Sequence, residues 1–276
     1  MKLELTEREE LLLCVNNCAQ KLNIPFLVIG ATARDFLLSH YDKNIASPSS
    51  TLDVDIACRV DGWTAYNKLY QCLIKQEEIS LDKTMMHRLL FRDKIPLDLL
   101  PFGLIGDDNN QVVWPGREDI ELSVIGFEDA YISRISIWIA DEMFSVACFA
   151  ALVWLKLSAW CDNKSRTKDL LDIWFIIDNY LELIPEERIY AEDGIDRDIF
   201  DDENFSTMRA GARLLGRDIR RKGGVSVRKL FGNIMKQSGE PSDNFVMAMT
   251  KVAPSSINSL DIIDMLQVLC VELFDV

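Results

Sequence analysis

The stretch Thr51-Leu52-Asp53-Val54-Asp55-Ile56 alternates apolar and acidic or polar side chains, and it continues in mostly apolar residues to Val60. Alternation of this kind is typical of a β-strand with one buried face, because successive side chains point to opposite sides. We therefore expect a strand over residues 51–60 that buries Leu52, Val54 and Ile56. Asp53 and Asp55 then leave the strand together on its other face.

Two carboxylates held this close repel each other and lose part of their hydration. A hard divalent cation removes that penalty, since Mg²⁺ prefers oxygen ligands and commonly sits between carboxylates and substrate phosphates. Asp53 and Asp55 are therefore candidate metal ligands. The alternative is a polar strand face turned to solvent, and this pair by itself does not decide between the two.

A third acid, Asp98, lies inside the apolar run Ile95–Leu100. Residues 88–92 and 95–102 are strand-like runs separated by Asp93-Lys94, which indicates a hairpin. If this hairpin pairs with the strand of Asp53, Asp98 joins the same face. Three acids there are sufficient to hold two metal ions, and Asp98 is then also a candidate acceptor for the proton of an attacking hydroxyl.

Gly30 follows the short apolar run Pro25–Ile29 and precedes a helical stretch over residues 31–39. A glycine between a buried strand and a helix allows backbone N–H groups to approach a phosphate. Arg34, one turn into that helix, is placed to reach the same phosphate. A simple strand-to-helix turn is the more common reason for a single glycine at such a position.

The remaining pattern predicts an α+β protein with a mixed sheet and a helical C-terminal domain. Helical spacing covers residues 7–22, 63–74, 149–160 and 168–183, whereas residues 103–119 have the composition of a loop. Thr6 and Glu9 form a capping box for the first helix. The composition changes near Pro185, so we expect a core over residues 1–185 and a second domain over 186–276.

Two oppositely charged segments follow that boundary. Residues 186–203 contain nine acids and two arginines, and residues 209–229 contain eight cations and only Asp218 as an acid. The basic segment is the part of the chain best suited to phosphates. Alternatively, it is a helix whose arginines pair with the acids of the preceding segment.

The net charge of −14 argues against a polyanion bound over the whole surface. The seven cysteines are scattered, and with only two histidines they form no zinc motif, so buried free thiols are the better interpretation. The sequence contains no apolar run long enough to cross a bilayer, and its first residues do not have the pattern of a signal peptide. We therefore expect a cytoplasmic protein without a membrane partner.

In order along the chain, these features resemble the nucleotidyltransferase superfamily with the polymerase-β-like fold. The motifs are a glycine turn, a D-x-D strand and a later aspartate: Gly30-Ala31-Thr32-Ala33-Arg34-Asp35, Thr51-Leu52-Asp53-Val54-Asp55-Ile56 and Leu97-Asp98-Leu99-Leu100-Pro101-Phe102-Gly103. The closest resemblance is to bacterial nucleotidyltransferases related to AbiEii-type toxins. It extends to Trp114-Pro115 and to residues 123–128, 155–160, 168–172 and 211–218.

The resemblance assigns roles to further residues. It implies that Lys156 binds the triphosphate and that Asp169 and Asp172 help to bind the nucleotide or the acceptor. Ala31 stands where the superfamily usually has serine or glycine, so a serine hydroxyl is absent while the backbone N–H remains. From the residues alone, two alternatives stay open: Lys156 as a snorkelling lysine at a helix end, and the two acids, with Lys168, as the exposed first turn of a helix.

The resemblance implies an enzyme that moves a nucleoside monophosphate from a nucleoside triphosphate to an acceptor hydroxyl, using Mg²⁺ or Mn²⁺. A toxin of this kind would act on tRNA or protein and have a cognate antitoxin. Three alternatives remain: a non-catalytic nucleotide-binding or regulatory module on the same fold, a nucleotidyltransferase for a small molecule such as an antibiotic, and a two-metal phosphatase or nuclease.

Overall fold

The computed structural model describes residues 5–48, 51–191, 194–199, 206–236 and 239–274. The chain forms two compact units. The N-terminal unit contains Met1–Phe36 and Ser50–Cys148, and the C-terminal unit contains Leu37–Ser49 and Phe149–Val276. The expected boundary near Pro185 therefore falls inside the C-terminal unit. The reason is that the apolar helices before it pack against the helices after it, as described below.

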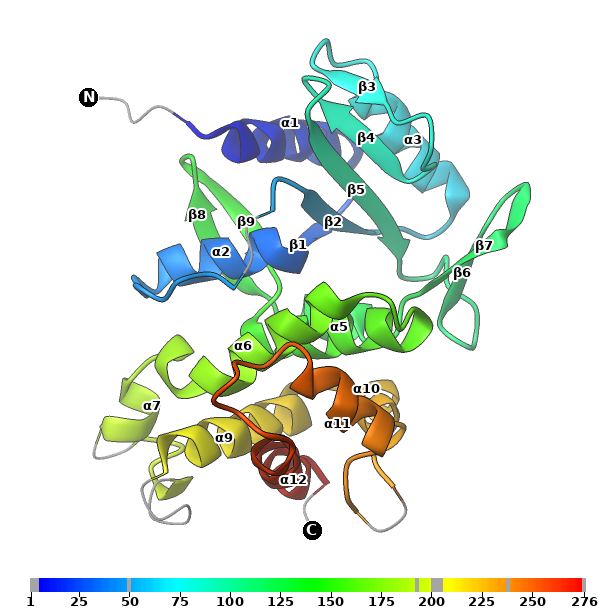
Figure 1. Ribbon diagram of the computed structural model, residues 1–276. Helices are drawn as coiled ribbons and strands as arrows, with labels where there is room; N and C mark the ends of the chain where they lie inside the picture. The colour runs from blue at the N-terminus through cyan, green and yellow to red at the C-terminus, as the bar shows by residue number, and fades with distance from the viewer. Residues whose placement is uncertain (1–4, 49–50, 192–193, 200–205, 237–238, 275–276) are drawn as a thin grey trace. The chain divides into compact units, whose positions relative to one another are not determined.

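The N-terminal unit is built on one mixed sheet (Figure 1). Its strands, in the order in which they lie side by side, are β3 (Ile79–Leu81), β4 (Arg88–Phe91), β5 (Ile95–Phe102), β2 (Val54–Arg59), β1 (Phe26–Ile29), β9 (Glu142–Val146) and β8 (Ile135–Ile139). Strand β2 pairs in parallel with β5 and antiparallel with β1. The strand of Asp55 is thus central, with the predicted hairpin β4–β5 directly beside it.

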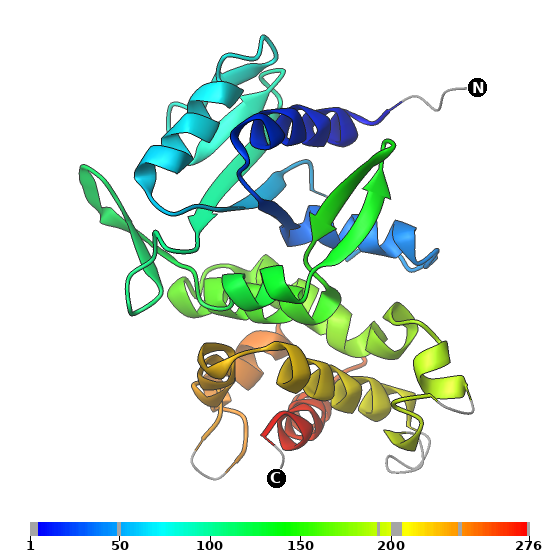
Figure 2. The same cartoon turned by 180° about the vertical axis from the view of Figure 1, so that it is seen from behind.

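Helices α1 (Glu7–Leu22) and α3 (Trp63–Leu73) pack side by side on one face of this sheet (Figure 2). The predicted capping box at the start of α1 is confirmed, since Thr6 and Glu9 exchange hydrogen bonds. Helix α2 (Gly30–His40) begins in the residue after β1, and α4 (Phe127–Ile132) precedes β8. The core of the unit is made of the apolar faces of the strands, including Leu27, Val54, Ile56 and Leu97, all completely buried.

The C-terminal unit is helical in its described residues. It contains α5 (Phe149–Asp162), α6 (Thr167–Leu183), α7 (Glu187–Tyr190), α9 (Thr207–Lys222), α10 (Val225–Gly232), α11 (Asp243–Thr250) and α12 (Ser259–Phe274). Helix α9 packs against α6 and α12, and α5 packs against α6. Gly216 permits the close approach of α9 to α12, because a Cβ at this position would lie 2.2 Å from the carbonyl oxygen of Leu269.

Some sequence-based expectations were wrong. Strand β2 begins at Val54, so Asp53 lies just before it, and Leu52 is 53% exposed rather than buried. Residues 103–119, expected to be loop, include β6 (Gln111–Trp114) and the start of β7 (Arg117–Ser123), which form a separate hairpin. Acids have low strand propensity, so the acid-rich β7 gave no strand signal. No helix in the described ranges has the length and apolar character needed to cross a membrane.

Candidate active site in the N-terminal unit

The sheet places Asp55 and Asp98 at the same level on neighbouring strands. In the parallel pairing of β2 with β5, Asp55 lies opposite Asp98, as Val54 lies opposite Leu97 and Ile56 opposite Leu99. Neighbouring strands are about 4.8 Å apart. Both aspartates are partly exposed, whereas the apolar residues on either side of them are buried. Asp55 and Asp98 thus share one face, as the sequence predicts.

Gly30 brings the start of α2 against Asp55. In the pairing of β1 with β2, Ile29 lies opposite Asp55, and Gly30 follows with a left-handed backbone (φ +68°). A Cβ at Gly30 would lie 2.0 Å from Oδ2 of Asp55. The missing side chain therefore leaves the space that this carboxylate occupies. It also puts the carboxylate beside the first turn of a helix, where N–H groups lack helical partners.

Asp53 is tied to the same helix through its backbone. The hydroxyl of Thr32, which is completely buried, donates to the carbonyl oxygen of Asp53 at 2.7 Å. The N–H of Asp53 donates to Oγ1 of Thr51 at 3.1 Å. Sequence reasoning gave Thr32 no role. Its contact with Asp53 fixes the segment before β2 to the first turn of α2.

Asp98 is engaged by an arginine that sequence reasoning missed. Arg88 lies opposite Asp98 in the β4–β5 hairpin, and it donates from Nε to Oδ1 at 2.6 Å and from its terminal nitrogen to Oδ2 at 2.7 Å. These hydrogen bonds raise the pKa of Arg88, burial opposes them, and the charges of Asp98 and then Asp53 raise it further. Asp53 is therefore near the same guanidinium. The sequence does contain a pattern that predicts this pair, because a hairpin turn centred on Asp93 places residue 88 opposite residue 98.

The chemistry of this donor set suits Mg²⁺ or Mn²⁺, since carboxylate oxygens are the ligands such cations prefer. The close approach of Gly30 to Asp55 also places the Asp55 carboxylate beside the first turn of α2. Across the described ranges, however, no group of three or more acidic, histidine or cysteine side chains is arranged to hold a metal ion. Arg88 accounts for part of this difference from the expected three-acid site, because it binds both oxygens of Asp98.

Arg34 lies inside the protein. Its side chain is fully buried and donates to Oδ1 of Asp35 at 2.9 and 3.1 Å, while Arg8 also pairs with Asp35. Ala31 lies beside Gly30 in the first turn of α2 and is partly exposed. The structure thus keeps Gly30 and Ala31 together at the helix start and gives Arg34 an internal ion pair.

Buried ion groups of the C-terminal unit

The C-terminal unit brings Lys156, Asp169 and Asp172 together. Lys156 on α5 lies 2.6 Å from Asp172 and 3.3 Å from Asp169 on α6, and Arg166 lies 2.5 Å from the other oxygen of Asp169. Lys156 and both acids are buried, which excludes the snorkelling lysine and the exposed helical turn considered for them. Lys156 and Arg166 balance the charge of the two carboxylates.

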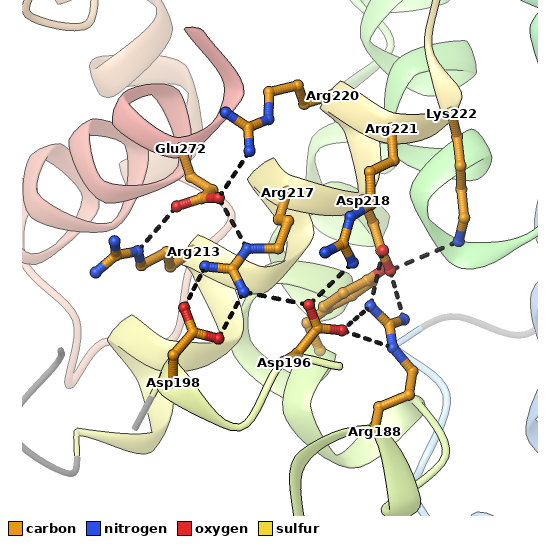
Figure 3. Close-up of polar contacts among 11 residues, drawn as sticks. Arg188, Asp196, Asp198, Arg213, Arg217, Asp218, Arg220, Arg221, Lys222 and Glu272 are labelled. Carbon is orange, nitrogen blue, oxygen red and sulfur yellow. Dashed lines mark hydrogen bonds and ion pairs between the residues drawn. The ribbon is translucent and has the colours of Figure 1, made fainter. Parts of the chain in front are cut away.

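The basic segment 209–229 pairs with acids of the same unit (Figure 3). On α9, Arg217 contacts Asp196, Asp198 and Glu272, and Arg221 also contacts Asp196. Arg188 binds both Asp196 and Asp218, Arg213 and Arg220 contact Glu272, and Arg209 contacts Asp264. The alternative in which these arginines pair with acids, several of them from residues 186–203, describes the segment better than a free phosphate-binding surface.

Relationship to known proteins

A mixed sheet whose central strands carry aspartates, beside a glycine-initiated helix, is the arrangement that the resemblance to nucleotidyltransferases implies. Residues 16–222, which are most of the chain, match the family described as "Nucleotidyl transferase AbiEii toxin, Type IV TA system". The chain belongs to this family and is a nucleotidyltransferase. The family match ends at the last residue of α9.

No curated protein matches the chain. Among solved structures, the antibiotic-resistance factor ANT(2'')-Ia, whose solution structure is described as revealing substrate-regulated conformation dynamics, is similar with a TM-score of 0.40 and 13% sequence identity. The match covers 71% of this chain and 95% of the other. A likeness this weak supports no conclusion about the substrate.

Proposed function

We propose that this protein transfers a nucleoside monophosphate from a nucleoside triphosphate to an acceptor hydroxyl, with Mg²⁺ or Mn²⁺ as cofactor. The observation that carries the proposal is the register of Asp55 with Asp98, together with the Gly30 backbone that fits against the Asp55 carboxylate. These residues lie in the N-terminal unit, and their contacts follow from sheet pairing and from one glycine.

In the reaction, the acceptor oxygen forms a bond to the α-phosphorus. The bond from this phosphorus to the oxygen that bridges it to the β-phosphorus breaks, so pyrophosphate leaves. A divalent metal supplies charge neutralisation and a lowered hydroxyl pKa when it is bound. We assign Asp53, Asp55 and Asp98 as its ligands. The N–H groups of Gly30 and Ala31 at the start of α2 hold a phosphate. Arg34 would have to leave its ion pair with Asp35 to bind this phosphate, so we assign it no contact with the phosphate.

Asp98 has a second role in this proposal, as the acceptor of the hydroxyl proton. Its two hydrogen bonds to Arg88 must then loosen when substrate binds. Arg88 would thereby act as the counter-ion of Asp98 in the empty enzyme, and its released guanidinium could pair with the triphosphate.

We assign Lys156 to the triphosphate, with Asp169 and Asp172 as the residues that orient its ammonium group. The acceptor is a hydroxyl of tRNA or of a protein, and a cognate antitoxin controls the enzyme in the cytoplasm. The family description supports the antitoxin, since it names a toxin–antitoxin system.

The test is transfer of label from each of four α-labelled nucleoside triphosphates to total tRNA, and to the protein itself, with and without Mg²⁺ or Mn²⁺. We expect Asp53→Ala combined with Asp55→Ala to abolish transfer while the circular dichroism spectrum stays native, because the metal loses two oxygen ligands. Glu121→Ala, which removes an exposed acid of β7 outside the site, is the control.

Activity retained in the double variant would contradict the assigned site. If no label moves to any acceptor although nucleoside triphosphates bind, the chain is a nucleotide-binding module. Label on a small molecule alone would make it a small-molecule nucleotidyltransferase.

A further inference from the structure

A cavity of about 410 Å³ opens in the N-terminal unit, lined by α3 and by residues around Asp82 and Trp114. Four aromatic side chains line it: Trp63, Tyr66 and Tyr70 from α3, and Trp114 from β6. Its volume is within the range of small-ligand sites. Leu81 and Met86 form part of the wall and are exposed to solvent, so an apolar surface lies open here.

The aromatic rings divide into a buried pair and an open pair. Tyr66 and Trp114 are almost completely buried, and their ring centroids are 6.1 Å apart in a T-shaped contact. Trp63 and Tyr70 are only partly buried. Trp63 contacts Trp114 at 5.1 Å, and Tyr70 stacks on Tyr66 at 6.1 Å. The buried rings therefore support two rings that border open space, which a plain hydrophobic core would not leave accessible.

Polar groups accompany the rings. Asn67 and Gln71 are four residues apart on α3, so their exposed amides lie on the same side of the helix. Each amide offers both hydrogen-bond donors and an acceptor. Asp82 also lines the cavity, and its carboxylate accepts hydrogen bonds from Thr84, which lower its pKa and keep it ionised.

Two of the rings that line the cavity contact chain neighbours of the Arg88–Asp98 pair. The hydroxyl of Tyr66 donates to the carbonyl oxygen of Leu99, the residue after Asp98, at 3.0 Å. The ring of His87, the residue before Arg88, lies 5.8 Å from that of Trp114. Burial lowers the pKa of His87, and the charges of Asp98 and Asp82 oppose this effect. The aromatic cluster therefore reaches the strands that hold the assigned acids.

We infer that this cavity binds a nucleobase, stacked against Trp63 and Tyr70 with its polar edge towards Asn67 and Gln71. A base offers two π-faces to aromatic rings and a rim of donors and acceptors to amides, and the lining offers both kinds of partner. The base belongs to the donor nucleoside triphosphate or to an acceptor nucleotide. This choice of source rests on the proposed function, whereas recognition of the ring does not.

The experiment measures binding of adenosine, guanosine, cytidine and uridine by calorimetry without metal. Nucleosides lack phosphate, so they probe the cavity independently of the acidic site. Loss of one base–aromatic stack corresponds to roughly 5- to 150-fold weaker binding. We expect a loss in this range for Trp63→Ala and for Tyr70→Ala. Trp138→Ala is the matched control, because Trp138 lies on β8 of the same unit and is 68% exposed.

If either aromatic variant fails to fold, Asn67→Ala combined with Gln71→Ala replaces it. Both amides are exposed, and their loss should change which nucleoside binds best. The inference is overturned if no nucleoside binds the wild-type protein at millimolar concentration. It is also overturned if the cavity variants bind as the wild type does, or if Trp138→Ala weakens binding equally.

Competition experiments then identify the source of the base. Displacement of the nucleoside by a nucleoside triphosphate but not by a short oligonucleotide assigns the cavity to the donor, and the reverse pattern assigns it to the acceptor. Asp53→Ala with Asp55→Ala should retain nucleoside binding. Transfer activity without nucleoside binding would refute the cavity alone, and nucleoside binding without transfer to any acceptor would refute the proposed reaction alone.

Discussion

Replacement of Gly30 by alanine tests whether the start of α2 and the Asp55 carboxylate form one site. Two costs follow from the structure. The left-handed backbone (φ +68°) costs alanine about 1–2 kcal/mol. The new Cβ would also lie 2.0 Å from Oδ2 of Asp55, so the carboxylate has to move by about 1 Å or more to reach an ordinary contact distance. A displacement of this size within a catalytic site lowers the rate roughly 100-fold.

Gly116→Ala separates the two costs. Gly116 has a similar backbone (φ +74°), but within the described part of the chain an added Cβ there meets no atom within 4 Å. Urea unfolding should show a loss of about 1–2 kcal/mol for this variant, with transfer and Mn²⁺ affinity unchanged. Gly30→Ala should lose at least as much stability, and also transfer activity and Mn²⁺ affinity.

The two variants must differ in function for the reasoning to hold. If Gly30→Ala transfers nucleotide and binds Mn²⁺ as Gly116→Ala does, then the contact between Gly30 and Asp55 does not belong to the active site. If both variants lose transfer equally, backbone strain explains the loss, and the position of Asp55 does not.

Three further predictions concern the ion pairs. Arg88→Ala should lower the free energy of unfolding by about 1–3 kcal/mol, because Asp98 loses two charged hydrogen bonds. The same variant should bind Mn²⁺ more tightly in calorimetry. Weaker Mn²⁺ binding would mean that Arg88 helps to hold the metal. Lys156→Ala should lower the free energy of unfolding by about 3–5 kcal/mol and weaken triphosphate binding, because it leaves buried carboxylates without their ammonium partner. Lys168→Ala, at an exposed position, should change neither quantity. Burial opposes ionisation of Glu272, but Arg217 and Arg213 hold its pKa below the ordinary value of 4.5. Its contribution is therefore present above about pH 4.5 and is lost as the pH falls through the lowered value, so the decline of the melting temperature below pH 4.5 should be shallower in Glu272→Gln.

The pattern of acidic residues in the sequence predicted much of the candidate site. Alternation around Asp55 and the apolar run around Asp98 predict strands, and the Asp93-Lys94 turn predicts their hairpin. These signals are local, because side-chain direction in a strand repeats every two residues. The sequence did not reveal the two hydrogen bonds that Arg88 donates to Asp98, which depend on hairpin register. It also gave no sign of the aromatic cavity, since Trp63 and Trp114 are far apart in the chain and meet only in the folded unit.

The predicted domain boundary near Pro185 differs from the division into compact units for a related reason. A change of composition near Pro185 marks where charged residues begin, but compact units are defined by packing. Helices α5 and α6 are apolar on several sides, and the surfaces that cover them come from α9, α10 and α11, which follow that change. The acidic segment is likewise no free linker, because Asp196 is completely buried among Arg188, Arg217 and Arg221.

By itself, the sequence determined the class of fold, most of the helices and strands, the family, and the acids that we assign to a metal. Each of these depends on residue type and short-range periodicity. The tertiary structure alone decided which charges meet. It placed Asp55 beside Gly30, paired Asp98 with Arg88, and brought two carboxylates into contact with Lys156. Such pairings depend on strand register and helix packing, and these are fixed by the whole core rather than by any single segment.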